Sequence, residues 1–477
     1  MNKKKIGIVL APLLAVLVYI IPMDLNQKAH LFFSIMVFTL TFWLTEVLPL
    51  GITALLGVAI AVVFGIANVK TAFSSLGHPV LLLFIGSFLI AQAMTKHGLD
   101  KRFALNFLSL PFFLKSPIRI IAGFSLVSFV LSMWISNTAT TAMLLPLSLG
   151  IITMFRQNHI KNIKTFAVFI LLSIAYSASI GGVSTLIGTP TNLIGVGFLR
   201  DEGYDIDFVK WMLIAMPISL TMYFALLLYI KFHLKGFSFD KEKIKELIHS
   251  EKNKLKKMSI GEKNTVITFS LAVFFWLLPG IANILGNEQL YKFLKAHIPE
   301  SIVALIAGIL LFLLPVDLRN FKGTLEVDDI RKIDWDTVLL FGGGIALGKL
   351  IIQTGLAKYI GERVAHLISP EHFILFLVTL ILAMIFLTEV SSNTATVITF
   401  VPILIGVLKE LHVDIFYPIV AVVIAASFAF MLPIATPPNA IIYGSKMIPI
   451  NKMVKVGFFL NLIGTIVITI WILIYMR

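Results

Sequence analysis

The stretch SSNTATVITFVP, residues 391–402, places hydroxyls and an amide in the middle of strongly apolar sequence. The same letters occur earlier in WISNTATTAMLLP, residues 134–146, and both stretches end on a proline. They lie inside two apolar segments, 117–155 and 370–409, each too long for a single membrane crossing. A polar turn inside such a segment predicts a re-entrant helical hairpin, because irregular backbone at membrane depth needs protein or water around it.

The composition is that of an integral membrane protein. Of the 477 residues, 58% are hydrophobic and only 13% are charged, whereas soluble domains carry about 25% charged residues. Repeated apolar windows of roughly 17–25 residues predict an all-α polytopic membrane protein. The chain has no cysteine, which excludes disulfides and thiol chemistry. The formal charge of +14 comes from predicted loops, a pattern that reports topology rather than nucleic-acid binding.

The basic residues predict a multi-pass protein with a cytoplasmic N-terminus. The first apolar run has no small-residue cleavage site, so we expect an uncleaved first span after Lys3. Arg156 and Lys164 fall on the same side as Lys3 only if 117–155 is a hairpin. The lysine-rich segment 232–263 also falls on that side, and the acidic loop 200–208 falls outside.

Three pairs of matching segments reveal an internal repeat. Asn137 and Asn393 lie 256 residues apart, and LLFIGSFLIAQAMTKHGL (82–99) matches LLFGGGIALGKLIIQTGL (339–356) at a spacing of 257. TPTN (189–192) and TPPN (436–439) follow at a spacing of 247. An odd number of crossings per unit predicts inverted repeats, the architecture of secondary transporters.

The repeat predicts the organisation of the whole chain. We expect an N-terminal transmembrane helix (1–30), a first inverted repeat (31–231), a basic cytoplasmic linker (232–263) and a second inverted repeat (264–477). The first repeat comprises scaffold helices 31–95, re-entrant hairpin 117–155, broken helix 163–199 and helix 209–231. The second comprises scaffold helices 264–352, re-entrant hairpin 370–409, broken helix 413–445 and helix 454–475.

The repeated motifs favour the binding of an anion with two charged ends. A hairpin tip exposes the first N–H groups of its second helix, and a helix N-terminus attracts anions without any cationic side chain. Pro190 and Pro437 cannot continue a helix, so they predict breaks whose freed carbonyls suit a small hard cation. Gly181, Gly182 and Gly188 precede the first break and allow the backbone to approach closely.

The doubled SNT and doubled TPxN motifs resemble the divalent anion/sodium symporter family, which holds sodium-coupled succinate, malate and citrate carriers and related exchangers. The resemblance runs from about residue 40 to the end. It implies an inverted-repeat elevator transporter with about eleven transmembrane helices, two re-entrant hairpins and a homodimeric scaffold. Two positions depart from the family pattern: Thr191 stands where a second proline is usual, and Lys446 stands where a small residue is common.

The resemblance also implies roles for individual residues. The residues implied to contact substrate are Asn137, Thr138, Thr189, Pro190, Asn393, Thr394, Thr436 and Pro437. One sodium ion would be held by Ser132, Ser136, Asn137 and Gly188, and the other by Thr388, Ser391, Asn393 and Ala435. No cofactor is expected, and sodium enters only as a coupling ion if the protein is a symporter.

The sequence therefore predicts a secondary transporter of C4/C5 dicarboxylates, such as succinate, malate, fumarate or 2-oxoglutarate, in the plasma membrane. Sodium-coupled symport and sodium-independent exchange both stay open. The alternatives within transport are a citrate or tricarboxylate carrier and an arsenite or sodium/proton antiporter type. An enzyme would need convergent titratable groups, but only Glu46 and Glu389 stand out as intramembrane carboxylates, with either proton-carrying or structural roles.

Overall fold

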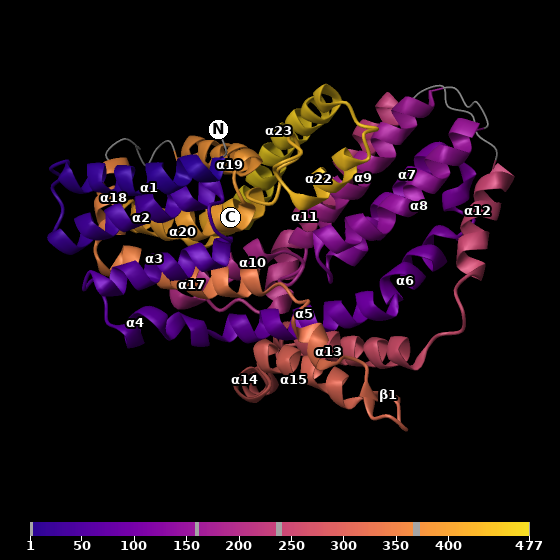
Figure 1. Cartoon of the computed structure of the whole chain (residues 1–477), viewed down its shortest axis with the longest axis horizontal. Coiled ribbons are helices and arrows are strands. Elements are labelled where there is room, and N and C mark those ends of the chain that lie inside the picture. The colour runs from indigo at the N-terminus through magenta and orange to yellow at the C-terminus, as the bar shows by residue number, and fades with distance from the viewer. Residues whose placement is uncertain (1–2, 158–161, 235–240, 366–372, 477) are drawn as a thin grey trace.

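The computed structural model shows an almost entirely helical protein (Figure 1), described over residues 3–157, 162–234, 241–365 and 373–476. Residues 235–240 of the predicted linker and 370–372 of the second predicted hairpin lie outside the described residues. The first half contains α1 Lys3–Ile20, α2 Gln27–Thr45, α3 Leu50–Val63, α4 Val69–Phe73, α5 Pro79–His97, α6 Leu99–Leu108, α7 Pro117–Ser132, α8 Asn137–Gln157, α9 Ile163–Val183, α10 Pro190–Asp201 and α11 Phe208–His233.

The second half continues in the same style, with one small strand pair. It contains α12 Lys241–Asn253, α13 Ile260–Ile284, α14 Glu288–His297, α15 Glu300–Leu313, α16 Val327–Ile330, α17 Trp335–Gln353, α18 Leu356–Ala365, α19 Phe373–Val390, α20 Asn393–Glu410, α21 Phe416–Ala425, α22 Pro437–Gly444 and α23 Ile450–Tyr475. The 3-10 helices are η1 Ser74–Gly77 and η2 Phe113–Lys115. Strands β1 Pro315–Asp317 and β2 Lys322–Gly323 pair antiparallel.

Within the described residues, nine helices are long and apolar enough to cross a membrane: α2, α5, α8, α9, α11, α13, α17, α20 and α23. The α14–α15 pair, bent by 54°, would make a tenth, and α3, α7, α19 and α21 are shorter apolar helices. This confirms the all-α polytopic class. This count differs from the expected eleven crossings for two reasons. It includes α8 and α20, which belong to the predicted hairpins. It leaves out α1, which begins with three lysines, and α3 and α21, which are short.

Both SNT motifs lie where one helix ends and the next begins. Helix α7 ends at Ser132 and α8 begins at Asn137, while α19 ends at Val390 and α20 begins at Asn393. The serine before each asparagine caps the new helix, because its hydroxyl accepts a backbone amide three residues on: Ala139 to Ser136 at 3.1 Å and Ala395 to Ser392 at 3.5 Å. The SNT serines thus start the second helix of each pair.

Both TPxN motifs lie just after an interruption in a helix. The chain leaves α9 at Val183 and enters α10 at Pro190, and it leaves α21 at Ala425 and enters α22 at Pro437. The motif asparagine bonds the interruption's free carbonyls through its amide nitrogen. Asn192 donates to Gly182 (3.0 Å), Val183 and Thr185 (2.7 Å). Asn439 donates to Ala429 (3.1 Å) and Leu432 (3.0 Å). Proline begins each new helix, and asparagine satisfies the backbone that the break exposes.

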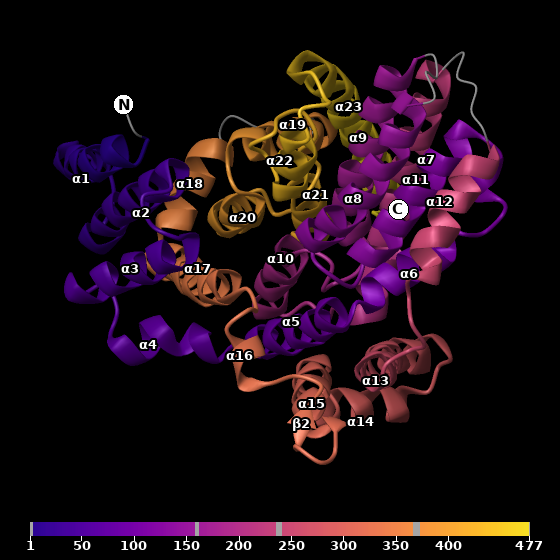
Figure 2. The ribbon, with the colours of Figure 1, turned by 45° about the vertical axis from the view of Figure 1, so that its right-hand side comes forward.

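The helices gather into two regions joined by a long element. Figure 2 shows α1 to α4 and α17 on one side and α7, α8, α9, α11 and α12 on the other, with α5 between them. Helix α5 packs along α15, and α3 packs along α17. Helices α5 and α17 each turn into a short helix, α6 and α18, through a glycine in the left-handed region: Gly98 (φ 70°) and Gly355 (φ 84°).

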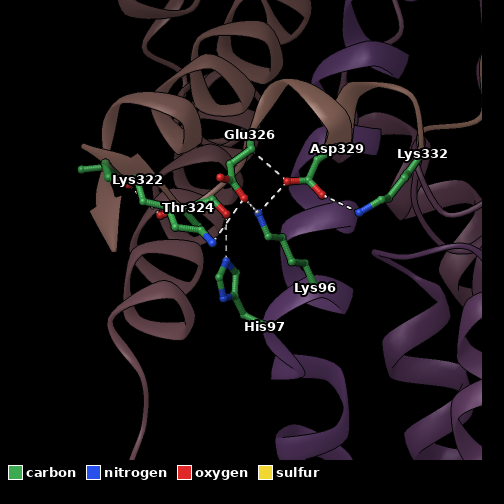
Figure 3. Close-up of polar contacts among 8 residues, drawn as sticks. Lys96, His97, Lys322, Thr324, Glu326, Asp329 and Lys332 are labelled. Atoms are coloured by element: carbon green, nitrogen blue, oxygen red, sulfur yellow. Dashed lines mark hydrogen bonds and ion pairs between the residues drawn. The ribbon is translucent and has the colours of Figure 1, made fainter. Parts of the chain in front are cut away.

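An ion-pair network anchors the end of α5 immediately before Gly98 (Figure 3). The Lys96 ammonium lies 2.6 Å from Asp329 and 3.4 Å from Glu326, and Lys332 donates to Asp329 at 3.0 Å. The neighbouring His97 ring bonds the Thr324 carbonyl at 2.9 Å. Burial alone would raise the pKa of the Asp329 carboxyl, but the hydrogen bonds from Lys96, the Glu326 amide and Lys332 outweigh it and hold the pKa well below 3.8. The network fixes the end of α5 on the N-terminal side of the turn at Gly98.

The charged stretch of the predicted linker 232–263, expected to be a solvated helix, forms a helix that is packed on one face. It contains α12 and the first turn of α13, which begins at Ile260. One face of α12 is apolar and packed, since Ile244 and Ile248 are buried and the helix lies on α6. The packed face was hard to predict from so charged a sequence, because apolar residues occur at helical spacing over only two turns.

Candidate functional site

One cavity of about 530 Å³ brings both repeated motifs together. The first SNT motif contributes Ser136, Asn137 and Thr138, and the second contributes Ser391, Ser392, Asn393 and Thr394. The two breaks contribute Gly188, Thr189 and Pro190, and Ile434, Ala435, Thr436, Pro437 and Pro438. All eight residues expected to contact substrate therefore line one cavity, although they come from four segments of the chain.

Four helices begin at this cavity. They are α8 at Asn137, α10 at Pro190, α20 at Asn393 and α22 at Pro437. Each N-terminus carries roughly half a positive charge on its free N–H groups. Among the lining residues the one cationic side chain is Lys3. At the four helix starts, an anion therefore meets backbone dipoles, hydroxyls and amides, whereas the carboxylates in the lining belong to other segments.

Oxygen atoms converge beside the first tip. The Ser132 hydroxyl donates to Oδ1 of Asn137. A Cβ built on Gly182 would lie 2.5 Å from that same Oδ1 and 3.1 Å from the Gly188 carbonyl oxygen. One built on Gly188 would lie 2.8 Å from the Ser132 carbonyl oxygen. The predicted ligands Ser132, Asn137 and Gly188 are thus close neighbours, and Gly182 is a further contact that only a residue without a side chain allows.

The second tip is assembled less completely. The Oδ1 atom of Asn393 is buried and has no hydrogen-bond partner among the described residues. The Thr388 hydroxyl bonds its own helix at Met384 (3.1 Å) and Ile385 (2.9 Å), and Thr388 does not line the cavity. Ser391 bonds the Thr396 hydroxyl at 2.7 Å. Three of the four predicted ligands, Ser391, Asn393 and Ala435, share the cavity wall, whereas Thr388 lies behind it.

The donor types at both tips fit a small hard cation. Hydroxyl, amide and carbonyl oxygens are the ligands that such ions take. An unpartnered buried amide oxygen such as Asn393 Oδ1 is costly unless something binds it. Sodium is therefore chemically compatible with these positions as a transported ion.

Of the two roles considered for Glu389, its contacts support the structural one. Its buried carboxylate accepts the backbone amides of Met431 (2.8 Å) and Leu432 (3.0 Å) and the side-chain amide of Asn461 (2.7 Å). Met431 and Leu432 belong to the interruption between α21 and α22. The carboxylate, which belongs to α19, thus fixes the backbone of the second break. The other intramembrane candidate, Glu46, lies exposed at the end of α2, 3.9 Å from Lys3.

The rim of the cavity comes from residues that sequence reasoning missed. Trp43, Asp334 and Asp336 line it together with Lys3 and Glu46. The Asp334 carboxylate caps α17 by accepting the Thr337 amide at 3.1 Å, and Asp336 accepts the Gly51 amide at 2.9 Å. No repeat or motif marks these residues, since they belong to the helices that face the tips and not to the tips themselves. Lys3 and Glu46 in the lining are largely exposed, so the cavity reaches the protein surface beside them.

The departure at Thr191 does not disturb the first break. Its hydroxyl lies 2.9 Å from the Ser427 hydroxyl and 3.3 Å from that of Thr189, and the side chain is fully buried. The Thr191 hydroxyl in α10 therefore connects the first break to the second, because Ser427 lies just after the end of α21.

Comparisons with known proteins identify the family of the chain. Residues 2–477 match the family described as the sodium:sulfate symporter transmembrane region. A sodium-dependent dicarboxylate transporter, SdcS, of Staphylococcus saprophyticus is 33% identical over 481 residues, covering 98% of this chain and 90% of the relative. SdcS of Staphylococcus aureus (strain USA300) is 33% identical over 479 residues, covering 97% and 89%.

A solved structure supports the fold alone. The YdaH transporter of Alcanivorax borkumensis aligns over 94% of this chain and 98% of its own, with a TM-score of 0.55 and 14% sequence identity. Its title describes an unusual topology. Since the family match spans nearly the whole chain, this protein belongs to the sodium:sulfate symporter family and is a multi-pass membrane transporter, not an enzyme.

Proposed function

We propose that this protein is a sodium-coupled carrier of C4/C5 dicarboxylates in the plasma membrane. The observation that carries the proposal is the single cavity lined by both SNT motifs and both TP breaks, with four helix N-termini around it. Two relatives with 33% identity over nearly the full length are named sodium-dependent dicarboxylate transporters, which supports this substrate class and coupling ion.

In this proposal each tip takes one carboxylate of the substrate. Asn137 and Thr138 bind one end, and Asn393 and Thr394 bind the other, through side-chain donors and the free N–H groups of α8 and α20. Thr189, Pro190, Thr436 and Pro437 close the cavity from the two breaks. A dianion suits this arrangement because the positive ends of helices are spread over two sides of the cavity and are not concentrated in one cationic side chain.

Sodium ions would bind beside the substrate and lower the repulsion between the dianion and the cavity carbonyls. One ion would be held by Ser132, Ser136, Asn137 and Gly188, and the other by Thr388, Ser391, Asn393 and Ala435. The contact between Ser132 and Asn137 and the close packing of Gly188 support the first set. The unpartnered Asn393 oxygen supports the second, in which Thr388 would have to turn from its own helix toward the ion.

We further propose an elevator mechanism in a homodimer. The two inverted repeats 31–231 and 264–477 would each supply a hairpin and a broken helix to the moving part, and α5 and α17 would remain with the scaffold. The glycine turns at Gly98 and Gly355 supply pivots in this scheme. With the N-terminus in the cytoplasm, a cavity that opens beside Lys3 corresponds to the inward-facing state.

Uptake of labelled succinate into proteoliposomes tests the proposed function. A sodium gradient alone should drive uptake, without dicarboxylate inside the vesicles. A strict need for internal dicarboxylate, with no effect of sodium, would instead identify an exchanger. Competition by unlabelled malate, fumarate, 2-oxoglutarate, citrate and sulfate then ranks the substrates, and stronger competition by citrate or sulfate than by malate would contradict the C4/C5 assignment.

A further inference from the structure

A second cavity, of about 420 Å³, lies away from the substrate site, between α6, α7, α8 and α12. Its walls are almost entirely apolar. Leu105 and Leu108 come from α6, Met143 and Leu147 from α8, and Leu247 and Ile248 from α12. The substrate-binding scheme uses none of these residues.

The cavity is open on one side. Pro146 in its wall is exposed, and the side chains of Met143, Leu147 and Leu247 are only half-buried. A volume of this size is within the roughly 300–1,000 Å³ typical of ligand sites. Because α7 and α8 are apolar helices of a membrane protein, their part of the wall is chemically suited to contact hydrocarbon.

Positive charge surrounds the other end of the cavity. Lys101 and Glu251 line it, with their charged atoms 3.8 Å apart, and the Lys101 side chain is about half exposed. The Lys252 ammonium donates to the Ser109 hydroxyl at 3.0 Å, next to Leu108 of the wall, and Lys254 pairs with Glu251. Two ammonium groups, those of Lys101 and Lys254, thus contact the Glu251 carboxylate, and a third, that of Lys252, has only a neutral hydroxyl as its partner among the described residues. Basic pockets of this kind at a membrane surface recognise anionic lipid headgroups.

We propose that this cavity binds one anionic phospholipid, with an acyl chain between α8 and α12 and the headgroup phosphate held by Lys101 and Lys252. The lysine distribution puts this end at the cytoplasmic side, where anionic lipids are concentrated in many membranes. The two parts of a phospholipid have matching surroundings here: an apolar slot between helices, and Lys101 in its wall with Lys252 on the neighbouring Ser109.

A lipid bound here would influence transport, because it would lie against the helix that begins at the substrate cavity. Helix α8 starts at Asn137, and its Pro146, Leu147 and Gly150 form part of the lipid cavity. The opposite walls belong to α6, which follows the anchored end of α5. An acyl chain between them would contact a moving hairpin on one side and the arm from the scaffold on the other.

The test uses delipidated full-length protein in a neutral detergent. Thermal unfolding is measured with added phosphatidylglycerol or with phosphatidylcholine of the same chains, and retained lipid is counted by native mass spectrometry. Phosphatidylglycerol should raise Tm more than phosphatidylcholine does, with one molecule retained per protomer. Soluble glycerol phosphate should give no shift, and a full shift from it would exclude the apolar cavity as part of the site.

Two variants address the two halves of the cavity. Leu247→Trp fills the apolar slot, and the double variant K101Q/K252Q removes the cationic end, so each should weaken phosphatidylglycerol binding by about tenfold or more. Leu228→Trp, at an exposed apolar position of α11, and the exposed pair K28Q/K70Q are matched controls that should keep the wild-type response. Equal shifts from both lipids, or full lipid retention in K101Q/K252Q, would overturn the proposal. Both readouts are independent of succinate transport.

Discussion

Replacing Gly182 with alanine should weaken sodium binding at the first tip. The new Cβ would lie 2.5 Å from Oδ1 of Asn137, whereas ordinary contacts begin at 3.4 Å, so the two groups must separate by about 0.9 Å. Asn137 already accepts the Ser132 hydroxyl and lines the substrate cavity, which leaves it little freedom to move without disturbing its oxygen. Adding one methyl to such a packed site costs about 1–3 kcal/mol, which corresponds to roughly 5- to 150-fold in affinity.

Two assays measure this effect, with Gly444→Ala as the matched control. Gly444 ends α22, and a Cβ there would meet no atom within 4 Å. In proteoliposomes, the sodium concentration for half-maximal succinate uptake should rise in G182A and stay unchanged in G444A. Sodium alone should also stabilise purified wild-type protein against heat more than it stabilises G182A. A G182A protein with the sodium response of G444A in both assays would refute the role of Asn137 Oδ1 in cation binding.

Two further substitutions test the supports of the site. Asp329→Asn removes the carboxylate that Lys96 contacts, so the variant should be less stable by about 1–3 kcal/mol in thermal unfolding at neutral pH. The pKa of Asp329 in the folded protein lies below 3.8, so the wild-type protein has this extra stability at neutral pH and should lose it as the pH falls below about 4. A stability difference that stays constant down to acid pH would contradict the role of the Asp329 carboxylate. Asn439→Ala removes the bonds to Ala429 and Leu432, so uptake should fall in protein that still inserts and folds, while exposed Asn451→Ala should leave uptake unchanged. Normal uptake by N439A would show that the break keeps its shape without this amide.

The parts of the fold that the sequence predicts are those set by local chemistry. Pro190 and Pro437 lack the N–H that would continue a helix, so the helices break before them. Ser136 and Ser392 accept backbone amides with their hydroxyls, so new helices start beside them. Long apolar windows likewise predict the membrane class without reference to other parts of the chain.

The parts that the sequence does not predict depend on partners far along the chain. Glu389 stands out as an intramembrane carboxylate, but its partners Met431 and Asn461 are 42 and 72 residues away, and no periodic pattern connects them. The rim residues Trp43 and Asp336 reach the cavity only through the packing of α2, α3 and α17 against one another.

Short amphipathic helices are also not predicted by the apolar windows that indicate membrane spans. Helices α6, α14 and α18 have ten residues each, with charged and apolar residues mixed, so an apolar window passes over them. They matter to the site because α6 and α18 are the connections after the glycine turns, next to the helices that carry the two tips.

In the proposed mechanism, two hairpin tips form one binding site for a dicarboxylate. Sodium-driven uptake of labelled succinate by Asn137→Ala and by Asn393→Ala, each reconstituted at the same protein density as wild type, tests it most directly. Each single substitution should abolish uptake while expression and assembly remain normal, and Asn451→Ala should transport like wild type. Near-normal uptake by either N137A or N393A would contradict it, because a dianion held at one tip alone would need no second clamp.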